Sequence, residues 1–296
     1  QGARGAAVAM GNFDGVHLGH QAILKLAATA AEAPLGVVTF EPHPRAYFAP
    51  TAAPFRLMNA EARAHRLEAL GVEVLYELSF NAGLAALTPQ GFVDDILVGR
   101  LGLKHITVGR DFRFGKDRAG DVAALRALGE ARGLGVTVAD LIAAGGVDVS
   151  STRIREALRE GRAEDAAAML GHLHRIEGVV VQGDQRGRDL GYPTANIGLD
   201  GLHLPKLGVY AVRFRVLTGE HAGDYDGVAS LGVRPLFGEN APNLETHVFD
   251  FRGDLYGADV SVALVSFLRP EETFDSLDAL ITQMDADSAR AREILA

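Results

Sequence analysis

Two histidines stand where a predicted strand passes into a predicted helix. His17 and His20 follow the apolar run 7–10 and precede apolar residues at helical spacing. The first N–H groups of a helix have no internal partners and favour anions, and residues three apart can project to one side. Two imidazole donors there would stabilise charge on a phosphate under attack. The pair predicts phosphate chemistry, although incidental surface histidines and an incomplete metal site show the same spacing.

The residues around this pair form a long motif. Gly11 and Gly15 allow a tight turn, and Gly19 lets a ligand approach the backbone closely. The whole string over 11–20, Gly-Asn-Phe-Asp-Gly-Val-His-Leu-Gly-His, resembles the signature of nucleotidyltransferases with a His-x-Gly-His motif. More narrowly, it resembles the N-terminal module of the bacterial bifunctional riboflavin kinase/FAD synthetase family. This resemblance implies that His17 and His20 are catalytic. It assigns to ATP the residues Gly11, Asn12 and Phe13.

Composition limits the class of protein. The chain has 296 residues, enough for two domains, with 48% hydrophobic and 23% charged residues. It has no cysteine, which excludes disulfides and thiolate sites and fits a cytoplasmic location. The net charge is −9 and no basic run is present, so nucleic acid is not an expected partner. No apolar run reaches membrane-spanning length, and the N-terminus does not resemble a secretory signal, so no membrane association is expected. The oligomeric state stays open.

Strand-like and helix-like stretches alternate through the first half of the chain. This alternation predicts an open, mostly parallel sheet with helices on both faces, which is an α/β fold of the Rossmann type. The expected strands are 7–10, 35–40, 72–77, 105–108 and 136–139. The expected helices begin after His17 and cover 60–70, 88–98 and 121–132.

Polar loops follow these strands at their carboxyl ends, where such sheets bind ligands. Glu-Pro-His-Pro at 41–44 follows the second strand, and Arg-Asp-Phe-Arg-Phe-Gly at 110–115 follows the fourth. The resemblance implies that both loops border the FMN and nucleotide pockets. It assigns to the flavin Pro42, His43, Pro44 and Asp111. Nearby aromatic residues fit either stacking on a flavin ring or ordinary packing. They are Tyr47, Phe48 and Phe55.

A second candidate anion site opens the helix expected over 150–160. Ser150, Ser151 and Thr152 are typical helix caps, but arginines follow them directly. Backbone amides and hydroxyls would hold phosphates there, with Arg155 as the counter-charge. The resemblance likewise assigns these four residues to the phosphates of ATP.

The pattern changes in the second half of the chain. Short β-type stretches separated by Gly, Pro, Asp and Asn predict a small antiparallel β-barrel. They cover 176–181, 208–216, 226–231, 244–251 and 260–268. A charged amphipathic helix over 276–295 is expected to lie on this barrel. Two short helices, 150–160 and 162–170, form the join. The join places the expected domain boundary after residue 171. The family resemblance implies that 1–171 is the FMN adenylyltransferase (nucleotidyltransferase) domain and 172–296 the riboflavin kinase domain.

Two strings in this half carry the kinase resemblance. The string 183–196 is rich in Gly and charge, which is typical of an exposed loop. Its last five residues, Tyr-Pro-Thr-Ala-Asn at 192–196, nevertheless resemble the Pro-Thr-Ala-Asn signature of riboflavin kinases. The resemblance assigns Thr194 and Asn196 to Mg-ATP, with hard oxygen ligands that suit Mg²⁺, and Gly187 to ATP. The stretch 243–251 resembles the strand that carries the catalytic glutamate of the family. Glu245 is therefore the expected base for the riboflavin 5′-hydroxyl.

The chain departs from the family in two loops. Gln185 and Asp189 replace a glycine and an uncharged residue, and Val233 and Leu236 replace two threonines. These changes leave an alternative open, an adenylyltransferase with a degenerate kinase domain that binds flavin.

The main expectation is a bifunctional transferase. Its C-terminal domain would convert riboflavin and ATP to FMN, and its N-terminal domain would convert FMN and ATP to FAD and pyrophosphate, with Mg²⁺ as the metal. Three other readings are weighed against it. They are an adenylyltransferase for another acceptor such as nicotinamide mononucleotide, a tRNA-charging enzyme, and a flavin carrier without turnover. The first conflicts with the kinase strings, and the second with the acidic balance and the lack of a lysine-rich motif.

Overall fold

The computed structural model describes residues 4–140, 143–144, 147–183, 191–234 and 241–296. The chain divides into two compact units. The first combines Gln1–Ala53 with Arg63–Val149, and the second combines Pro54–Ala62 with Ser150–Ala296. Each unit is described by itself.

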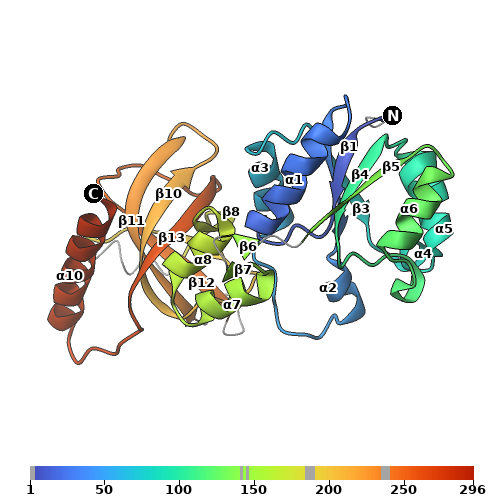
Figure 1. The fold of residues 1–296 in the computed structure, drawn as a ribbon. Coiled ribbons are helices and arrows are strands. Elements are labelled where there is room, and N and C mark those ends of the chain that lie inside the picture. Colours follow the sequence, from blue (N-terminus) through green and yellow to red (C-terminus); the bar gives the residue numbers. More distant parts are fainter. Residues whose placement is uncertain (1–3, 141–142, 145–146, 184–190, 235–240) are drawn as a thin grey trace. The chain divides into compact units, whose positions relative to one another are not determined.

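The first unit is built on a five-stranded parallel sheet (Figure 1). Its strands are β1 (Ala7–Met10), β2 (Leu35–Glu41), β3 (Val74–Ser79), β4 (His105–Gly109) and β5 (Gly135–Ala139). The spatial order is β3-β2-β1-β4-β5, and β1 pairs with β2 from Ala7↔Leu35 and with β4 from Ala7↔His105. The chain therefore adds strands on one side of β1 and then changes to the other side. Ligands bind beyond the carboxyl ends of strands at such a switch point, here between β1 and β4.

Helices connect the strands of this sheet, as the alternation predicts. Figure 1 shows α1 on one face and α4, α5 and α6 on the other. The elements are α1 (Leu18–Ala30), α2 (Pro44–Phe48), α3 (Ala60–Glu68), α4 (Ala82–Ala85), α5 (Pro89–Gly91), a π-helical segment (Phe92–Arg100), a 3-10 turn (Lys116–Arg118) and α6 (Val122–Glu130). The helix expected over 88–98 thus continues in a wider form, with Leu101 N–H donating to the carbonyl of Ile96 at 2.9 Å. Buried apolar residues such as Val8, Ile106 and Leu125 form the core between sheet and helices.

The second unit begins with the two short helices expected at the join. They are α7 (Ser151–Arg159) and α8 (Ala163–Leu170), and α8 ends at Gly171, which has φ 71°. A small hairpin, β6 (Ala143–Ala144) with β7 (Val147–Asp148), precedes them at the end of the first unit.

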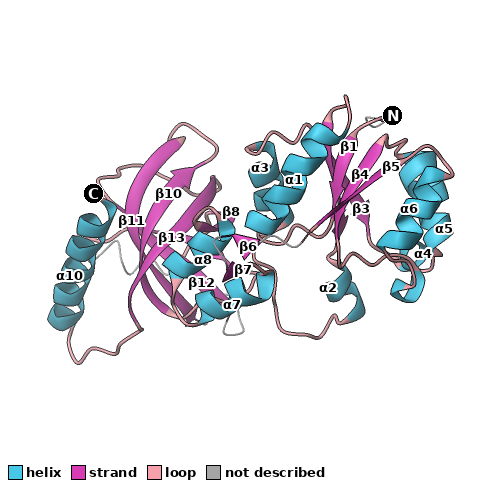
Figure 2. Cartoon of the chain, in the orientation of Figure 1, coloured by secondary structure: helices cyan, strands magenta, loops and turns pink. Residues whose placement is uncertain are grey.

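A six-stranded antiparallel sheet dominates the second unit (Figure 2). Its strands are β8 (His174–Val179), β9 (Thr194–Gly198), β10 (Gly208–Val216), β11 (Gly223–Arg234), β12 (Ala241–Val248) and β13 (Asp259–Arg269). The order is β8-β13-β10-β11-β12-β9, and the sheet curls until its outer strands meet. Val181, just after β8, bridges to Asn196 of β9, where the Val181 N–H donates to the Asn196 carbonyl at 2.9 Å. The predicted barrel is confirmed, and its core includes Ile176, Tyr210, Leu244 and Val262.

The terminal helix α10 (Leu277–Leu295) packs on β10, β11 and β13. Ala291 and Leu295 are buried there with Ala211 and Phe249. In the described ranges, no helix is both long enough and apolar enough to cross a membrane.

The sequence prediction missed β9. The composition of 183–196 favours an exposed loop, but β9 begins at Thr194, and Ala195 and Ile197 belong to the barrel core. Cross-strand pairing with β12 therefore determines the conformation of this short stretch.

Candidate active sites

The turn after β1 holds two residues in left-handed backbone conformation that are not glycine. Phe13 has φ 52° and Val16 has φ 42°, and Gly15 between them has φ 86°. Both side chains are completely buried, and Val16 N–H donates to the Phe13 carbonyl at 3.2 Å. A β-branched residue rarely adopts this conformation, so burial must hold it. Such strained residues concentrate at functional sites.

His17 and His20 lie together at the start of α1, as predicted. Their rings stack with centroids 3.7 Å apart and planes 17° apart, and Phe13 lies 4.9 Å from the His20 ring. His17 is the N-cap, and its Nδ1 accepts from the His20 N–H at 3.4 Å. Burial and the neighbouring His17 hold the pKa of His20 well below its usual value. His20 is therefore neutral at pH 7, and its buried Nδ1 has no hydrogen-bond partner among the described residues.

Gly19 sets the position of the His17 imidazole. A Cβ on Gly19 would lie 3.1 Å from Cε1 and 3.2 Å from Nδ1 of His17, closer than ordinary contact. The sequence predicts Gly19 to allow a ligand close to the backbone. The structure adds that any side chain there would displace His17.

The loops after β1, β2 and β4 emerge at one edge of the sheet. Asn12, exposed beyond β1, is fixed through its carbonyl, which accepts from Thr39 Oγ1 of β2 at 3.2 Å. Asp111 is exposed beyond β4, close to Gly109, whose Cβ would lie 3.2 Å from Asp111 Oδ1. Because β1 lies between β2 and β4 in a parallel sheet, all three loops leave the sheet at the same edge, where such folds bind ligands.

The Pro42–Pro44 loop is anchored on both sides. Glu41 and Pro42 are joined by a cis peptide bond, and His43 caps α2, with its Nδ1 accepting from Arg45 N–H at 3.0 Å. Glu41 Oε2 accepts from Arg63 Nη2 at 3.1 Å, and the same nitrogen donates to Glu77 Oε2 at 2.7 Å. The side chain of Arg63 is 2% exposed, so a buried cation positions the end of β2.

The aromatic residues Tyr47, Phe48 and Phe55, which fit either flavin stacking or ordinary packing, lie in two different places. Tyr47 and Phe48 form edge-to-face contacts with Phe80 beyond the ends of β2 and β3, and Phe48 is 69% exposed. Phe55 is buried in the second unit, where the Arg155 guanidinium lies 5.5 Å from its ring centroid. Phe55 is thus a packing residue, whereas Tyr47 and Phe48 offer an exposed apolar surface.

The residues predicted around α7 belong to the second unit. Ser150 is the N-cap, and its Oγ accepts from Arg153 N–H at 3.4 Å. Ser151 is half-buried and Thr152 is exposed. Arg155 Nε donates to the Phe55 carbonyl at 2.6 Å, so this guanidinium also has a structural partner.

In the barrel, β9 and β12 bring the kinase residues into one polar row. Glu245 pairs with Asn196 in the register. Asn243 Nδ2 donates to Glu245 Oε1 at 3.1 Å and to Asn196 Oδ1 at 3.3 Å, and Asn196 Nδ2 donates to Thr194 Oγ1 at 3.4 Å. Thr194, Asn196, Asn243 and Glu245 therefore form one continuous set.

Asn243 was not singled out from the sequence. It is 2% exposed, and its Oδ1 has no hydrogen-bond partner among the residues that the structure describes. Residues two apart on a strand share a face, so the spacing from Glu245 would have revealed it.

The donor set of this row fits Mg²⁺. Hydroxyl and amide oxygens of Thr194, Asn196 and Asn243 lie beside one carboxylate, and hard oxygens are the ligands that Mg²⁺ prefers. The unpartnered Asn243 Oδ1 is an acceptor that a cation would satisfy. Within the described ranges, no cluster of three or more His, Cys, Asp or Glu side chains offers another metal site.

A cavity of about 340 Å³ opens beside Glu245. Thr194 and Glu245 lie on its sheet side, and Phe274, Leu280 and Met284 provide an apolar wall. Its size falls in the range of small-ligand pockets, and a few polar groups in an apolar lining are typical of them.

Several predicted positions lie outside the described residues, namely Gln185, Gly187, Asp189 and Leu236. Of their surroundings, Gly183 is described, and a Cβ there would lie 2.7 Å from Asn196 Nδ2. Val233 is 40% exposed on β11.

Comparison with protein families gives two matches along the chain. A family model described as FAD synthetase matches residues 1–153, and a model described as riboflavin kinase matches residues 170–295. The second match spans both loops that depart from the usual pattern, which supports the two-activity interpretation over the adenylyltransferase-only alternative.

Curated relatives match nearly the whole chain. A bifunctional riboflavin kinase/FMN adenylyltransferase from Pseudomonas fluorescens is 43% identical, over 99% of this chain and 94% of the relative. The enzyme of the same name from Escherichia coli K12 is 39% identical, over 98% and 92%. A solved structure described as a macrolide-efflux protein from Streptococcus pneumoniae is 33% identical, with a TM-score of 0.84 over 98% of this chain and 95% of that one. That description belongs to the other protein, and the shared feature is the two-unit fold.

Both motif sets, both matched models and full-length relatives thus agree. The chain belongs to the family of bifunctional riboflavin kinase/FMN adenylyltransferases.

Proposed function

We propose that this protein makes FAD from riboflavin in two ATP-dependent steps. The barrel transfers the γ-phosphate of ATP to riboflavin, and the parallel-sheet unit transfers AMP from a second ATP to the FMN formed. The observation that carries the proposal is the row from Thr194 to Glu245 at the edge of an apolar cavity. A flat apolar ring fits such a cavity, while its hydroxyl-bearing chain meets the carboxylate.

In the kinase step, Glu245 is the general base. It accepts the proton of the riboflavin 5′-hydroxyl as that oxygen bonds to the γ-phosphorus and the bond to ADP breaks. Asn243 donates to Glu245 Oε1 and so orients the carboxylate. Thr194 and Asn196 would hold Mg²⁺, which neutralises charge on the transferring phosphate. We propose Mg²⁺ as this metal because its ligands would be hard oxygens.

In the adenylyltransferase step, an FMN phosphate oxygen attacks the α-phosphorus of ATP and pyrophosphate leaves. His17 Nδ1 accepts from the His20 N–H, so its proton lies on Nε2, which can donate to a phosphate oxygen. His20 stays neutral because of its lowered pKa, and it supports the first imidazole by stacking. Positioning and neutralising two anions is most of the chemistry required.

The remaining assignments complete the proposal. Pro42, His43, Pro44 and Asp111 bind the flavin nucleotide, because their loops emerge at the switch-point edge. ATP contacts are assigned to Gly11, Asn12, Phe13, Ser150, Ser151, Thr152, Arg155 and Gly187. The adenylyltransferase domain is assigned to 1–171 and the kinase domain to 172–296. The helices α7 and α8 end the first range but belong to the second compact unit. A cytoplasmic location fits the cysteine-free chain.

A time course with riboflavin, ATP and Mg²⁺ tests both steps. The parent protein is expected to make FMN and then FAD, separated by chromatography. His17→Ala is expected to stop at FMN. Glu245→Gln is expected to make nothing from riboflavin but to convert added FMN. His65→Gln and Glu220→Gln change exposed residues and serve as matched controls.

The assay tests the kinase step and the adenylyltransferase step independently. A parent that converts added FMN but never riboflavin has no active kinase. A parent that converts neither flavin would reject the proposal in favour of a carrier or another acceptor.

A further inference from the structure

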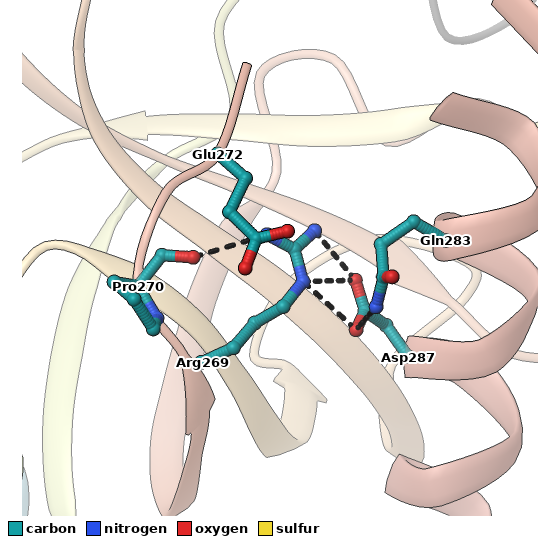
Figure 3. A network of polar contacts seen from close by, with 5 residues as sticks. All are labelled: Arg269, Pro270, Glu272, Gln283 and Asp287. Atoms are coloured by element: carbon teal, nitrogen blue, oxygen red, sulfur yellow. Dashed lines mark hydrogen bonds and ion pairs between the residues drawn. The ribbon is translucent and has the colours of Figure 1, made fainter. Parts of the chain in front are cut away.

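Arg269 lies where three parts of the cavity wall meet. It is the last residue of β13, and its guanidinium binds the Asp287 carboxylate of α10. Nε donates to Asp287 Oδ1 and Oδ2 at 3.0 Å each, and Nη2 donates to Oδ2 at 2.8 Å (Figure 3). The strand end and the helix are thus joined by a two-pronged ion pair.

The same guanidinium also fixes the connection between β13 and α10. Nη1 donates to the Pro270 carbonyl at 3.0 Å and lies 4.0 Å from Glu272 Oε2. Cζ lies 5.7 Å from the ring centroid of Phe274. All three nitrogens of Arg269 therefore have partners within the chain, which favours a structural task over direct chemistry on phosphate.

Burial and geometry make this pair rigid. The Arg269 side chain is 15% exposed and that of Asp287 is 8% exposed. Gln283 Nε2 donates to Asp287 Oδ1 at 2.9 Å, from one turn earlier on α10. A planar guanidinium bound by both carboxylate oxygens has little rotational freedom. A buried ion pair adds little net stability, because the cost of desolvating the two charges offsets their attraction.

The segments that this pair holds are those that line the cavity. Glu272 and Phe274 come from the connection, and Leu280 and Met284 come from the first half of α10. Glu245 approaches from β12, on the sheet side. The Arg269–Asp287 pair therefore joins the strand end to the helix that forms the wall opposite Glu245.

We propose that Arg269 and Asp287 are positioning residues for the flavin acceptor. They hold residues 270–276 and α10 at the distance that a flat ring requires, and they take no part in phosphoryl transfer. This inference rests on the proposed kinase function. It predicts an effect on riboflavin affinity with little effect on turnover.

The chain offers a matched control on the same helix. Arg292 of α10 binds Asp250 after β12 through two hydrogen bonds of 2.8 and 3.0 Å. This pair is exposed and lies outside the cavity lining. Asp250→Asn loosens α10 without touching the cavity.

The experiment measures kinase kinetics of the full-length protein. Arg269→Gln and Asp287→Asn are each expected to raise the KM for riboflavin about tenfold or more, with kcat within about threefold and the KM for ATP unchanged. The riboflavin KM of the double variant is expected to be no higher than that of the more impaired single variant, because each substitution already breaks the same ion pair. Asp250→Asn is expected to leave both KM values unchanged. Conversion of added FMN to FAD should continue in all variants.

Three results would overturn the inference. They are an unchanged riboflavin KM, a loss of kcat at constant KM, or an equal KM increase in Asp250→Asn. If Arg269→Gln or Asp287→Asn does not fold, Arg269→Lys is the deciding variant. It keeps the positive charge but loses the two-pronged contact of the guanidinium with Asp287. An unchanged riboflavin KM in Arg269→Lys would reject the inference. A parent without riboflavin phosphorylation would instead mean that the kinase proposal itself is wrong.

Discussion

Gly19 shows how one missing side chain shapes the proposed adenylyltransferase site. The imidazole of His17 lies against the place where a Cβ would be, and its stacking on His20 depends on that space. The sequence predicts the two histidines and the glycine between them. It could not predict the stacking, because the strained turn at Phe13 and Val16 that directs the first ring comes from burial.

Gly19→Ala is therefore expected to separate activity from stability. Alanine is a better helix former than glycine by about 1 kcal/mol, so the melting temperature should stay the same or rise. FAD formation from added FMN should fall about tenfold or more, because displacement of a catalytic group by a fraction of an ångström to one ångström is costly. Kinetics with FMN and a thermal melt test this. Gly223→Ala is the control, since its Cβ would meet only ordinary contacts at 3.7 Å or more. Full activity in Gly19→Ala would contradict the prediction.

At the scale of elements, the start of α7 is observed in one task and proposed for a second. Ser150 caps the helix, and it is also assigned to the phosphates of ATP. The sequence left both roles open, and the structure describes only the cap geometry.

Two substitutions at Ser150 separate these tasks. Ser150→Ala should lower the free energy of unfolding by about 1 kcal/mol, since the cap is lost. Ser150→Asp keeps a good cap but places a negative charge beside the phosphates, so stability should recover while the KM for ATP in FAD formation rises about tenfold. Denaturant unfolding and ATP titrations measure the two effects. An unchanged KM for ATP in Ser150→Asp would mean that Ser150 only caps the helix and does not bind ATP.

Elements with a strong internal pattern are the ones that the sequence predicted well. Gly208–Val216 matches its expected range, and α10 starts one residue after its Ser276 cap. The short strand β9 and the hairpin β6–β7 were missed, because their conformation depends on partners distant in the chain or on very few residues. Asn243 was missed although its spacing from Glu245 places both on one face of β12, because its hydrogen bond to Asn196 appears only where β9 pairs with β12.

At the scale of the whole molecule, a buried histidine links folding of the second unit to pH. His174 is 3% exposed at the start of β8. Burial, with His172 and His203 nearby, lowers its pKa to about 3. The unfolded chain binds a proton near pH 6.5, so it is favoured progressively as pH falls from 6.5 toward 3. Well above pH 6.5 the imidazole is neutral in both states, so its charge has no effect on stability there.

The expected loss for this group between pH 7 and pH 5 is about 2 kcal/mol. His174→Gln should show a correspondingly smaller decrease in unfolding free energy over the same interval. Urea unfolding of the C-terminal unit at both pH values measures this difference. His65→Gln changes an exposed residue, so its unfolding free energy should decrease between pH 7 and pH 5 as much as that of the parent. Equal pH dependence in the parent and His174→Gln would refute the assignment.

The bridge between Val181 and Asn196 has a consequence for self-association. In an open sheet, the two outermost strands present rows of unpaired N–H and C=O groups, which can recruit strands of other molecules. Here β8 and β9 are the outermost strands, and the curl of the sheet joins them at that bridge. Where β8 and β9 meet, the barrel therefore pairs some of the backbone N–H and C=O groups that could otherwise bind strands of other molecules. In the part of the first unit that the structure describes, the parallel sheet ends in β3 and β5, and no such bridge joins these two strands.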